Sequence, residues 1–362
     1  MGKEASGDMK VLITGGAGFV GSNLACFLKR EFRSWKVVSF DNLHRRGSEL
    51  NLPRLKDAGV SFVHGDIRNK EDLQQVGNFD LLIECSAEPS VLAGYDESPE
   101  YLINTNLMGT INCLERCRLT KADVIFLSTS RVYPMDMINN LKYDEDETRF
   151  ELASRQEIAG VSEYGFSEEL SLSGIRSLYG GTKLCSEIML QEYTAAYDIR
   201  GIINRCGVLT GPWQMGKIDQ GFVALWVARH LWKGELAYIG YNGTGKQVRD
   251  ILHIEDLYAL LQRQIKSLDN YSGKIFNVGG GREVSVSLCE LTEFCQEITG
   301  NKIAITSIPE TRKADIPYYV SDCRYIQKEA GWSPSKNPRD IVSDIYEWLR
   351  EYETILKPVF CK

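Results

Sequence analysis

The chain has 362 residues, a net charge of −7 and a pI near 5.4, and 43% of its residues are hydrophobic. This charge disfavours binding to nucleic acid or to an anionic membrane surface, and no run of about 20 apolar residues predicts a membrane-spanning helix. The ten cysteines form no Cys-x-x-Cys pair and there are only four histidines, a pattern that argues against a metal site and favours a reduced, cytoplasmic protein.

The first half of the chain alternates short apolar runs with amphipathic stretches. Strands are expected at 10–14, 36–40, 61–64, 80–84, 122–127 and 201–204, with long helices at 99–118 and 179–197. This alternation predicts an α/β fold with a Rossmann-like, doubly wound parallel sheet. Because ligands bind beyond the carboxyl ends of such strands, the polar residues that follow them are candidate site residues.

The second half of the chain consists of shorter units. We expect a helix near 221–233, strands near 251–253 and 274–278 that return to the main sheet, and amphipathic helices at 286–300 and 338–352. The prediction is therefore a nucleotide-binding domain at 9–206, with returning strands near 250–256 and 274–279. A smaller, interleaved α/β substrate-binding lobe is expected at 207–249 and 280–356.

A glycine-rich turn joins the first predicted strand to the first predicted helix. In Thr14-Gly-Gly-Ala-Gly-Phe-Val-Gly21 the glycines stand at 15, 18 and 21, where they would let backbone N–H groups approach a pyrophosphate at the helix N-terminus. The alternative is a tight turn without a ligand. Asp41, which follows the second strand, would accept the ribose hydroxyls of NAD and repel the extra phosphate of NADP, although Arg45 and Arg46 weaken that preference.

Tyr179 and Lys183 are four residues apart and would lie on the same side of a helix. There the ammonium can lower the pKa of the phenol from its usual value of about 10. A phenolate so placed can remove a proton from a hydroxyl group while a nicotinamide takes the hydride. The spacing alone also arises by chance, so its weight comes from the motifs upstream.

Taken in order, the glycine turn, Asp41, Asp66-Ile67, Asn106-Leu-Met-Gly-Thr110, Thr129 and the Tyr179/Lys183 pair resemble one known family. This is the extended short-chain dehydrogenase/reductase family of nucleotide-sugar epimerases and dehydratases, and the resemblance covers about residues 9–350. It implies that Tyr179 is the general base, that Lys183 binds the nicotinamide ribose and that Thr129 contacts the reacting hydroxyl. The residues expected to hold NAD are Gly15, Gly18, Phe19, Val20, Gly21, Asp41, Asn42, Arg46, Asp66, Ile67, Ala87, Asn106, Tyr179, Lys183 and Cys206.

The residues after Thr129 indicate the branch of the family. The related 4,6-dehydratases carry an Asp-Glu pair there, whereas this chain has Ser130-Arg131, so the resemblance implies epimerisation. Segments such as Asp144-Glu-Asp-Glu-Thr-Arg149 and Gly245-Lys-Gln-Val-Arg-Asp250 most resemble the CDP-tyvelose (CDP-paratose) 2-epimerases, which implies inversion at carbon 2 of a CDP-linked deoxy sugar. A 4-epimerase of UDP- or another nucleotide sugar, a non-catalytic NAD-binding regulator and a net oxidoreductase remain alternatives.

The nucleotide-diphosphate sugar would need positive charge placed locally, because the overall charge is negative. Arg249 and Arg312 match family positions that bind the diphosphate, and guanidinium groups suit phosphate oxygens; surface salt bridges are the alternative. The full set expected at the substrate is Thr129, Arg131, Arg205, Gln214, Asp219, Gln220, Arg249 and Arg312. The family also implies a homodimer through the helices near 99–118 and 179–197, whereas Glu88 and Cys206 depart from its usual residues.

Overall fold

The computed structural model describes residues 8–153, 156–217 and 220–361, and the chain divides into two compact units. Unit 1 comprises the chain up to Val132, Leu178–Arg205 and Tyr258–Phe276; unit 2 comprises Tyr133–Ser177, Cys206–Leu257 and the chain from Asn277 onward. We predicted interleaving, but placed residues 133–177 in the nucleotide-binding domain. They belong to unit 2 because their backbone hydrogen-bonds there: the Phe166 N–H donates to the Val320 carbonyl at 2.8 Å.

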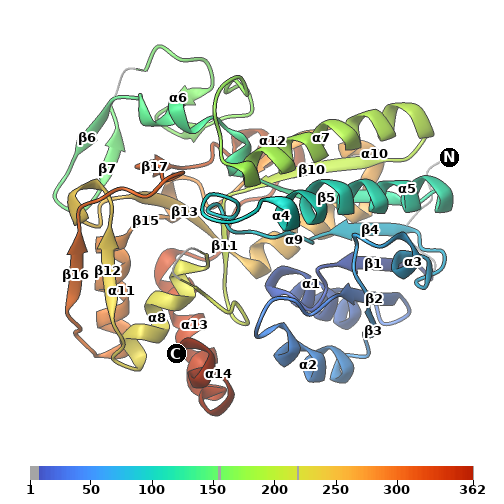
Figure 1. Cartoon of the computed structure of the whole chain (residues 1–362), viewed down its shortest axis with the longest axis horizontal. Helices are drawn as coiled ribbons and strands as arrows, with labels where there is room; N and C mark the ends of the chain where they lie inside the picture. The colour runs from blue at the N-terminus through green and yellow to red at the C-terminus, as the bar shows by residue number, and fades with distance from the viewer. Residues whose placement is uncertain (1–7, 154–155, 218–219, 362) are drawn as a thin grey trace. The chain divides into compact units, whose positions relative to one another are not determined.

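A seven-stranded parallel sheet forms the centre of the nucleotide-binding fold (Figure 1). Its strands are β1 (Lys10–Thr14), β2 (Lys36–Asp41), β3 (Ser61–His64), β4 (Leu81–Glu84), β5 (Asp123–Thr129), β10 (Gly201–Cys206) and β14 (Ile275–Val278). They follow the order β14-β10-β5-β4-β1-β2-β3. The strand order therefore reverses between β1 and β4, where doubly wound sheets bind their ligands. The prediction of a Rossmann-like sheet is confirmed.

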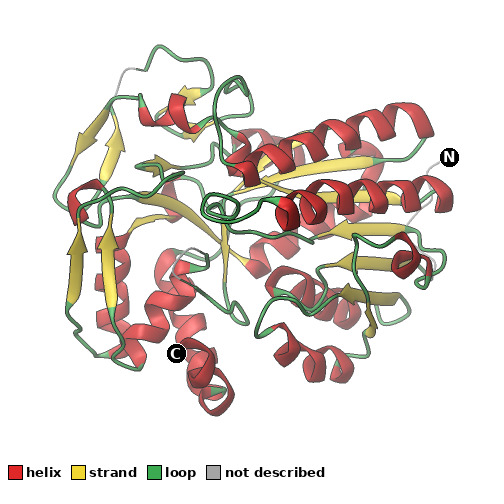
Figure 2. Ribbon diagram, in the orientation of Figure 1, coloured by secondary structure: helices red, strands yellow, loops and turns green. Residues whose placement is uncertain are grey.

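Helices cover both faces of this sheet, as Figure 2 shows. They are α1 (Phe19–Glu31), η1 (Ser48–Asn51), α2 (Leu52–Asp57), α3 (Lys70–Gln74), α4 (Glu100–Ile103), η2 (Asn104–Gly109), α5 (Thr110–Thr120), η3 (Ser130–Val132), α7 (Leu178–Tyr197), α9 (Ile254–Lys266) and α10 (Leu268–Tyr271). In Figure 1, α5 and α7 lie side by side on one face, and α1 and α2 lie on the other. Leu82 and Phe126 from the sheet pack there against Leu114 and Leu190 from the two helices.

The helix expected at 99–118 is present, but it is interrupted by a π-helical turn, η2, between α4 and α5. At this turn the chain passes close to β3's following loop: a Cβ on Gly109 would lie 2.5 Å from Cδ1 of Ile67. A larger residue at position 109 would therefore displace the Ile67 side chain. Single π turns inside helices often mark functional sites, and this one carries the predicted cofactor residue Asn106.

Unit 2 is built from smaller sheets and a group of helices. Its elements are α6 (Met135–Asn139), β6 (Tyr143–Glu145), β7 (Phe150–Leu152), β8 (Val161–Ser162), β9 (Gly165–Phe166), β11 (Val208–Thr210), α8 (Phe222–Leu231), β12 (Leu236–Ile239), η4 (Tyr241–Gly243), β13 (Val248–His253), η5 (Arg282–Val284), β15 (Ser285–Ser287), α11 (Leu288–Thr299), β16 (Ile305–Ile308), β17 (Tyr318–Tyr319), α12 (Arg324–Ala330), α13 (Pro338–Glu351) and α14 (Glu353–Phe360). We expected a strand near 251–253 to return to the main sheet, but these residues do not join it. They are part of β13, which pairs with β11, β15 and β17, because residues 248–250 carry the ladder to Ser285–Ser287 and Tyr318–Tyr319.

Two helices of unit 2 begin at capping boxes that are visible in the sequence. Ser287 and Glu290 satisfy each other's backbone N–H groups at the start of α11, and Asn337 and Asp340 do the same at the start of α13. The Trp213 ring lies 4.8 Å from that of Tyr352, so this residue anchors the loop after β11 within unit 2. Among the described residues, no helix has the length and apolar character needed to cross a bilayer.

Asp250 on β13 is a buried acid whose titration predicts a pH-dependent stability. Its carboxylate lies where a Cβ on Gly279 or Gly207 would collide, and it accepts the Ser321 N–H at 3.2 Å. Burial raises the pKa of Asp250 to about 6, against hydrogen bonds from Ser321. Because the folded-state pKa lies above the unfolded value of about 3.9, ionisation opposes folding. The contribution of protonated Asp250 to the stability of the fold is therefore fully present below about pH 4, and it is lost as the pH rises through about 6.

We therefore expect the free energy of unfolding of the wild type to rise relative to Asp250→Asn by about 2 kcal/mol between pH 7.5 and pH 4.5. Urea denaturation of both proteins across this range measures the difference, in which groups common to both proteins cancel. A parallel pH dependence in the two proteins would contradict the assignment.

Candidate active site

The glycine-rich turn fits a phosphate-binding role. Gly15 follows β1 with φ of +62°, and a Cβ on Gly21 would lie 2.3 Å from the Gly15 carbonyl oxygen. Gly18 precedes α1 and supplies no side-chain cap to its first turn, which begins with Phe19 and Val20. The first turn of α1, a helix of 13 residues, has backbone N–H groups without partners inside the helix. An anion is favoured at this N-terminus.

Asp41 ends β2 beside this turn. One carboxylate oxygen accepts the Ala17 N–H at 3.1 Å and the other accepts the Leu43 N–H at 2.7 Å, so the side chain is tied to the glycine turn. Burial raises the pKa of Asp41, and these two hydrogen bonds act against that shift. A fixed carboxylate at the end of β2 is the group expected to receive ribose hydroxyls.

Asp66 forms a cluster with Asn42 and Arg68 at the end of β3. The Asn42 amide donates to Asp66 at 2.9 Å, and the Arg68 guanidinium donates at 2.7 Å. Burial alone would raise the pKa of Asp66, but these hydrogen bonds outweigh it and lower the pKa to about 2. Ile67 is 5% exposed, its side chain packs on Gly109, and its carbonyl accepts the Asn112 amide at 2.9 Å. Its contact with adenine stays a prediction. Arg46 is exposed on the loop after β2.

The three predicted catalytic residues come from two neighbouring elements of unit 1. Thr129 is the last residue of β5, is 8% exposed, and accepts the Arg131 N–H at 3.2 Å. Tyr179 lies half-buried in the first turn of α7, and Lys183 follows one turn later. Because α7 packs on β5 and η3, the fold brings the threonine strand end and the tyrosine helix turn to the same face of the sheet.

Lys183 has a partner that sequence analysis missed. Its side chain is 2% exposed, and its ammonium lies 3.6 Å from a carboxylate oxygen of Glu84, the last residue of β4. It also lies 4.1 Å from the ring centroid of Phe126 on β5. The available signal was an acidic residue that ends an otherwise apolar strand, Leu81-Leu-Ile-Glu84, beside the predicted nucleotide turn.

Asn106 connects the loop after β4 to helix α7. Its side chain accepts the Glu88 N–H at 2.7 Å and donates to the Glu88 carbonyl at 3.0 Å and to the Thr182 hydroxyl at 3.4 Å. The Thr182 hydroxyl in turn donates to the Tyr179 carbonyl. Asn106 thereby positions the loop that contains Ala87, and it braces the turn that carries the tyrosine. Whether these residues contact NAD stays a prediction.

A second buried ion pair was also missed. Arg205 on β10 donates to both carboxylate oxygens of Glu187 on α7, at 3.1 Å and 2.7 Å, and Ser128 donates to the same carboxylate. The charged side chains are 4% and 1% exposed. This pairing gives Arg205 a structural partner within unit 1; its role at the substrate stays a prediction. Cys206, which ends β10, is buried and belongs to unit 2.

Arg131, like Thr129 and Arg205, lies in unit 1, where it is half-buried in η3, whereas Gln214, Gln220, Arg249 and Arg312 lie in unit 2. Arg249 pairs with Asp315 at 2.9 Å and donates to the Ile316 carbonyl at 2.8 Å, so a diphosphate would have to compete with a carboxylate there. Gln214 is fixed by hydrogen bonds with Thr210 and the Leu209 carbonyl. Gln220 pairs with Lys217 through the backbone, Arg312 is half-buried, and Asp219 lies outside the described residues.

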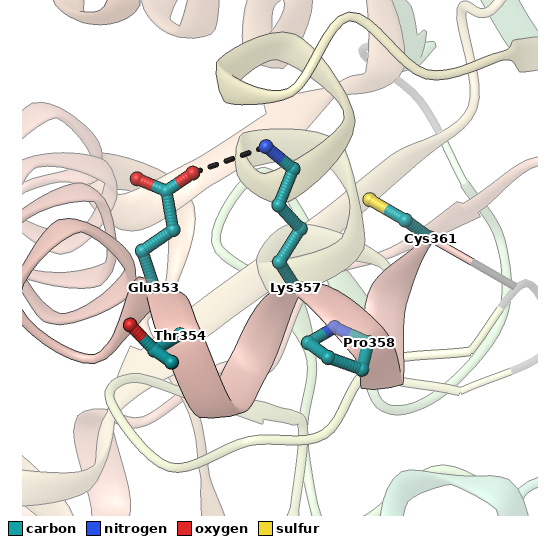
Figure 3. Close-up of a pocket in the computed structure, with 5 residues that line it drawn as sticks. All are labelled: Glu353, Thr354, Lys357, Pro358 and Cys361. Atoms are coloured by element: carbon teal, nitrogen blue, oxygen red, sulfur yellow. Dashed lines mark hydrogen bonds and ion pairs between the residues drawn. The ribbon is translucent and has the colours of Figure 1, made fainter.

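A surface hollow of about 460 Å³ is lined by Glu353, Thr354, Lys357, Pro358 and Cys361 (Figure 3). All five belong to α14 or follow it directly, and Lys357 is paired with Glu353 at 3.1 Å. The hollow shares no residue with the predicted site. The predicted site residues lie instead at the ends of β1, β2, β4 and β5 and on α7.

Comparison with known proteins identifies the family. Residues 11–279 match the model of the NAD dependent epimerase/dehydratase family, so the chain belongs to that family and is an NAD-dependent enzyme of the epimerase type. It is 31% identical to CDP-paratose 2-epimerase of Salmonella typhi, over 94% of this chain and 99% of the relative. It is 26% identical to dTDP-glucose 4,6-dehydratase of Salmonella typhimurium, over 94% and 92% of the two chains.

Solved structures agree at the level of the fold. UDP-glucuronic acid 4-epimerase from Bacillus cereus, in complex with UDP-glucuronic acid and NAD, superposes with a TM-score of 0.77 at 24% identity, over 95% of this chain and 99% of that chain. The predictions of the family, of the fold and of NAD as cofactor are confirmed.

Proposed function

We propose that the protein is a nucleotide-sugar epimerase that retains NAD and inverts carbon 2 of a CDP-linked deoxy sugar. The observation that carries this proposal is the similarity to CDP-paratose 2-epimerase, which extends over nearly the full length of both chains. Ser130-Arg131 after Thr129 supports it, because the acidic pair that dehydration would use is not at these positions.

The chemistry follows from the residues at the strand ends. Bound NAD supplies a hydride acceptor that later returns the hydride. Tyr179, as a phenolate, takes the proton from the hydroxyl on the reacting carbon. It gives the proton back when the hydride returns to the opposite face of the transient ketone. Thr129 orients that hydroxyl, and Lys183 stabilises the phenolate electrostatically. The hydride and the proton are both returned, so the reaction needs no net oxidant.

The substrate assignment is tested with a panel of CDP-, UDP-, GDP- and dTDP-linked sugars, with the products analysed by NMR. We expect inversion at carbon 2 of a CDP-deoxy sugar without a net change in cofactor absorbance. Inversion at carbon 4 of a UDP-sugar would replace the proposal by the 4-epimerase alternative. Net accumulation of reduced cofactor, or loss of water from the sugar, would contradict epimerisation.

We further propose a cytoplasmic homodimer that supplies precursors for bacterial surface polysaccharides. In support of an interface through α5 and α7, exposed apolar side chains lie on and beside these helices, including Leu119, Ile188 and Tyr197. Sedimentation of the purified protein measures the oligomeric state, and a monomer would contradict this part of the proposal.

A further inference from the structure

The carboxylate of Glu84 is buried at the point where the strand order of the sheet reverses. Glu84 is 1% exposed and pairs in register with Thr14 of β1 on one side and with Phe126 of β5 on the other. Its side chain lies on the same face as Leu82, two residues earlier, above the apolar layer that α5 and α7 cover. A carboxylate in this position needs hydrogen bonds and a counter-charge.

The hydrogen bonds reach only one of its two oxygens. Oε1 accepts the Ser86 N–H at 3.0 Å and the Thr14 hydroxyl at 3.5 Å. Oε2 is buried without a hydrogen-bond partner among the described residues, and it faces the Lys183 ammonium at 3.6 Å. The lysine is therefore the group that balances the charge of this oxygen.

Lys183 is held from two sides by neighbouring strands. Glu84 provides the opposite charge, and the ring of Phe126, 4.1 Å away, provides a cation–π contact. Both groups lie at matching positions of β4 and β5, so the sheet register fixes where the ammonium sits.

We propose that Glu84 is a positioning residue whose carboxylate is the built-in counter-charge of Lys183, and that it thereby sets the pH range in which Tyr179 and Lys183 act. This inference rests on the proposed roles of Tyr179 and Lys183. Glu84 itself does not touch the reacting atoms; it acts through the lysine.

Two other titratable groups described near Glu84 and Lys183 are Glu187, which has partners of its own, and Cys113. Glu187, one turn after Lys183 on α7, is committed to Arg205 of β10 and to Ser128 of β5. On α5, burial and the charge of Glu84 raise the pKa of the Cys113 thiol well above its usual value, so it stays neutral. Burial raises the pKa of Glu84 itself, and Lys183 acts in the opposite direction.

Glu84→Gln is the direct test, because glutamine keeps the shape and can still accept the Ser86 N–H but carries no charge. Removing a nearby negative charge lowers the pKa of every neighbouring acid. The kcat–pH profile of Glu84→Gln should therefore lie at lower pH than that of the wild type, by roughly one unit. Glu84→Asp, with the charge withdrawn by one methylene, should give an intermediate shift.

A readout that does not depend on turnover separates this inference from the proposed function. The chain has 17 tyrosines, so the titration of Tyr179 must be separated from the others. Subtracting the tyrosinate absorbance of the corresponding Tyr179→Phe protein from that of the wild type, and likewise from that of Glu84→Gln, isolates Tyr179. We expect this difference to titrate at lower pH in Glu84→Gln than in the wild type. An unchanged midpoint would overturn the inference even if epimerisation is established, whereas a lowered midpoint in a protein that epimerises no sugar of the panel would overturn only the proposed function.

Thr14→Val is the matched control, because it removes a hydrogen-bond donor to the Glu84 carboxylate without changing the charge of that carboxylate. The kcat–pH profile of Thr14→Val should stay near that of the wild type. If Glu84→Gln does not fold, Lys183→Met carries the test. Glu84 then lacks its counter-charge and should be protonated at pH 7, with an infrared carboxylic acid band that is absent from Lys183→Met/Glu84→Gln. Absence of this band in Lys183→Met would overturn the inference.

Discussion

Replacing Tyr179 by phenylalanine is expected to lower kcat about 1,000-fold while the protein keeps its NAD. Phenylalanine removes the hydroxyl that exchanges the proton with the sugar, and a positioned acid–base group contributes roughly 100- to 10,000-fold to a rate. The ring remains, so the first turn of α7 and the hydrogen bond from Thr182 to the backbone carbonyl of residue 179 are preserved. The measurement is turnover of the epimerised sugar by NMR, with bound NAD determined after denaturation.

Tyr197→Phe is the matched control for this experiment. Tyr197 ends the same helix, is 40% exposed, and contacts Tyr193 and Arg118 through its ring. Its conversion to phenylalanine should leave kcat unchanged within about twofold. Equal activity of Tyr179→Phe and Tyr197→Phe would exclude the acid–base role of Tyr179.

Arg205→Met is expected to lower the free energy of unfolding by about 3–5 kcal/mol. The change keeps an apolar stem of similar length but leaves the Glu187 carboxylate buried at 1% exposure without its counter-charge. Breaking a buried pair from one side costs this much because the remaining charge cannot be hydrated. Urea denaturation followed by circular dichroism measures the loss.

Two further variants identify the cause of that loss. Arg118→Met breaks a pair with Glu115 on α5 whose side chains are 34% and 36% exposed, and it should cost less than about 1 kcal/mol because water screens these charges. The double change Arg205→Met/Glu187→Leu removes both buried charges and should recover most of the stability. A single change at Arg205 that costs no more than Arg118→Met would show that the buried pair contributes little.

Much of the nucleotide-binding half could be predicted from local pattern. The runs that became β1 and β4 are buried on both faces, as strands of a covered parallel sheet must be. The predicted bounds of β1, β3 and β4 differ from the observed ones by at most one residue. The glycine turn and the Tyr179/Lys183 spacing are also local. Each is readable because its signal lies within a few residues.

Unit 2 was harder to predict because its strands are short and their partners are distant. Residues 251–253 have the apolar character of a main-sheet strand, yet β13 pairs with β11, β15 and β17. Similarly, residues 133–177 belong to unit 2 through contacts such as Phe166 with Val320. Strand partners are chosen by hydrogen-bond register across long sequence separations, which periodicity does not encode.

The sequence by itself determined the fold class, the family and the residues that carry the proposed chemistry, because these depend on motifs of fixed spacing. Only the tertiary structure decided what surrounds those residues. It placed Glu84 beside Lys183 and Arg205 beside Glu187, because a buried charge must find its partner on whichever strand or helix the packing brings within reach. Lys183, which the sequence predicted from its spacing to Tyr179, is thereby part of a buried ion pair with Glu84, the last residue of β4.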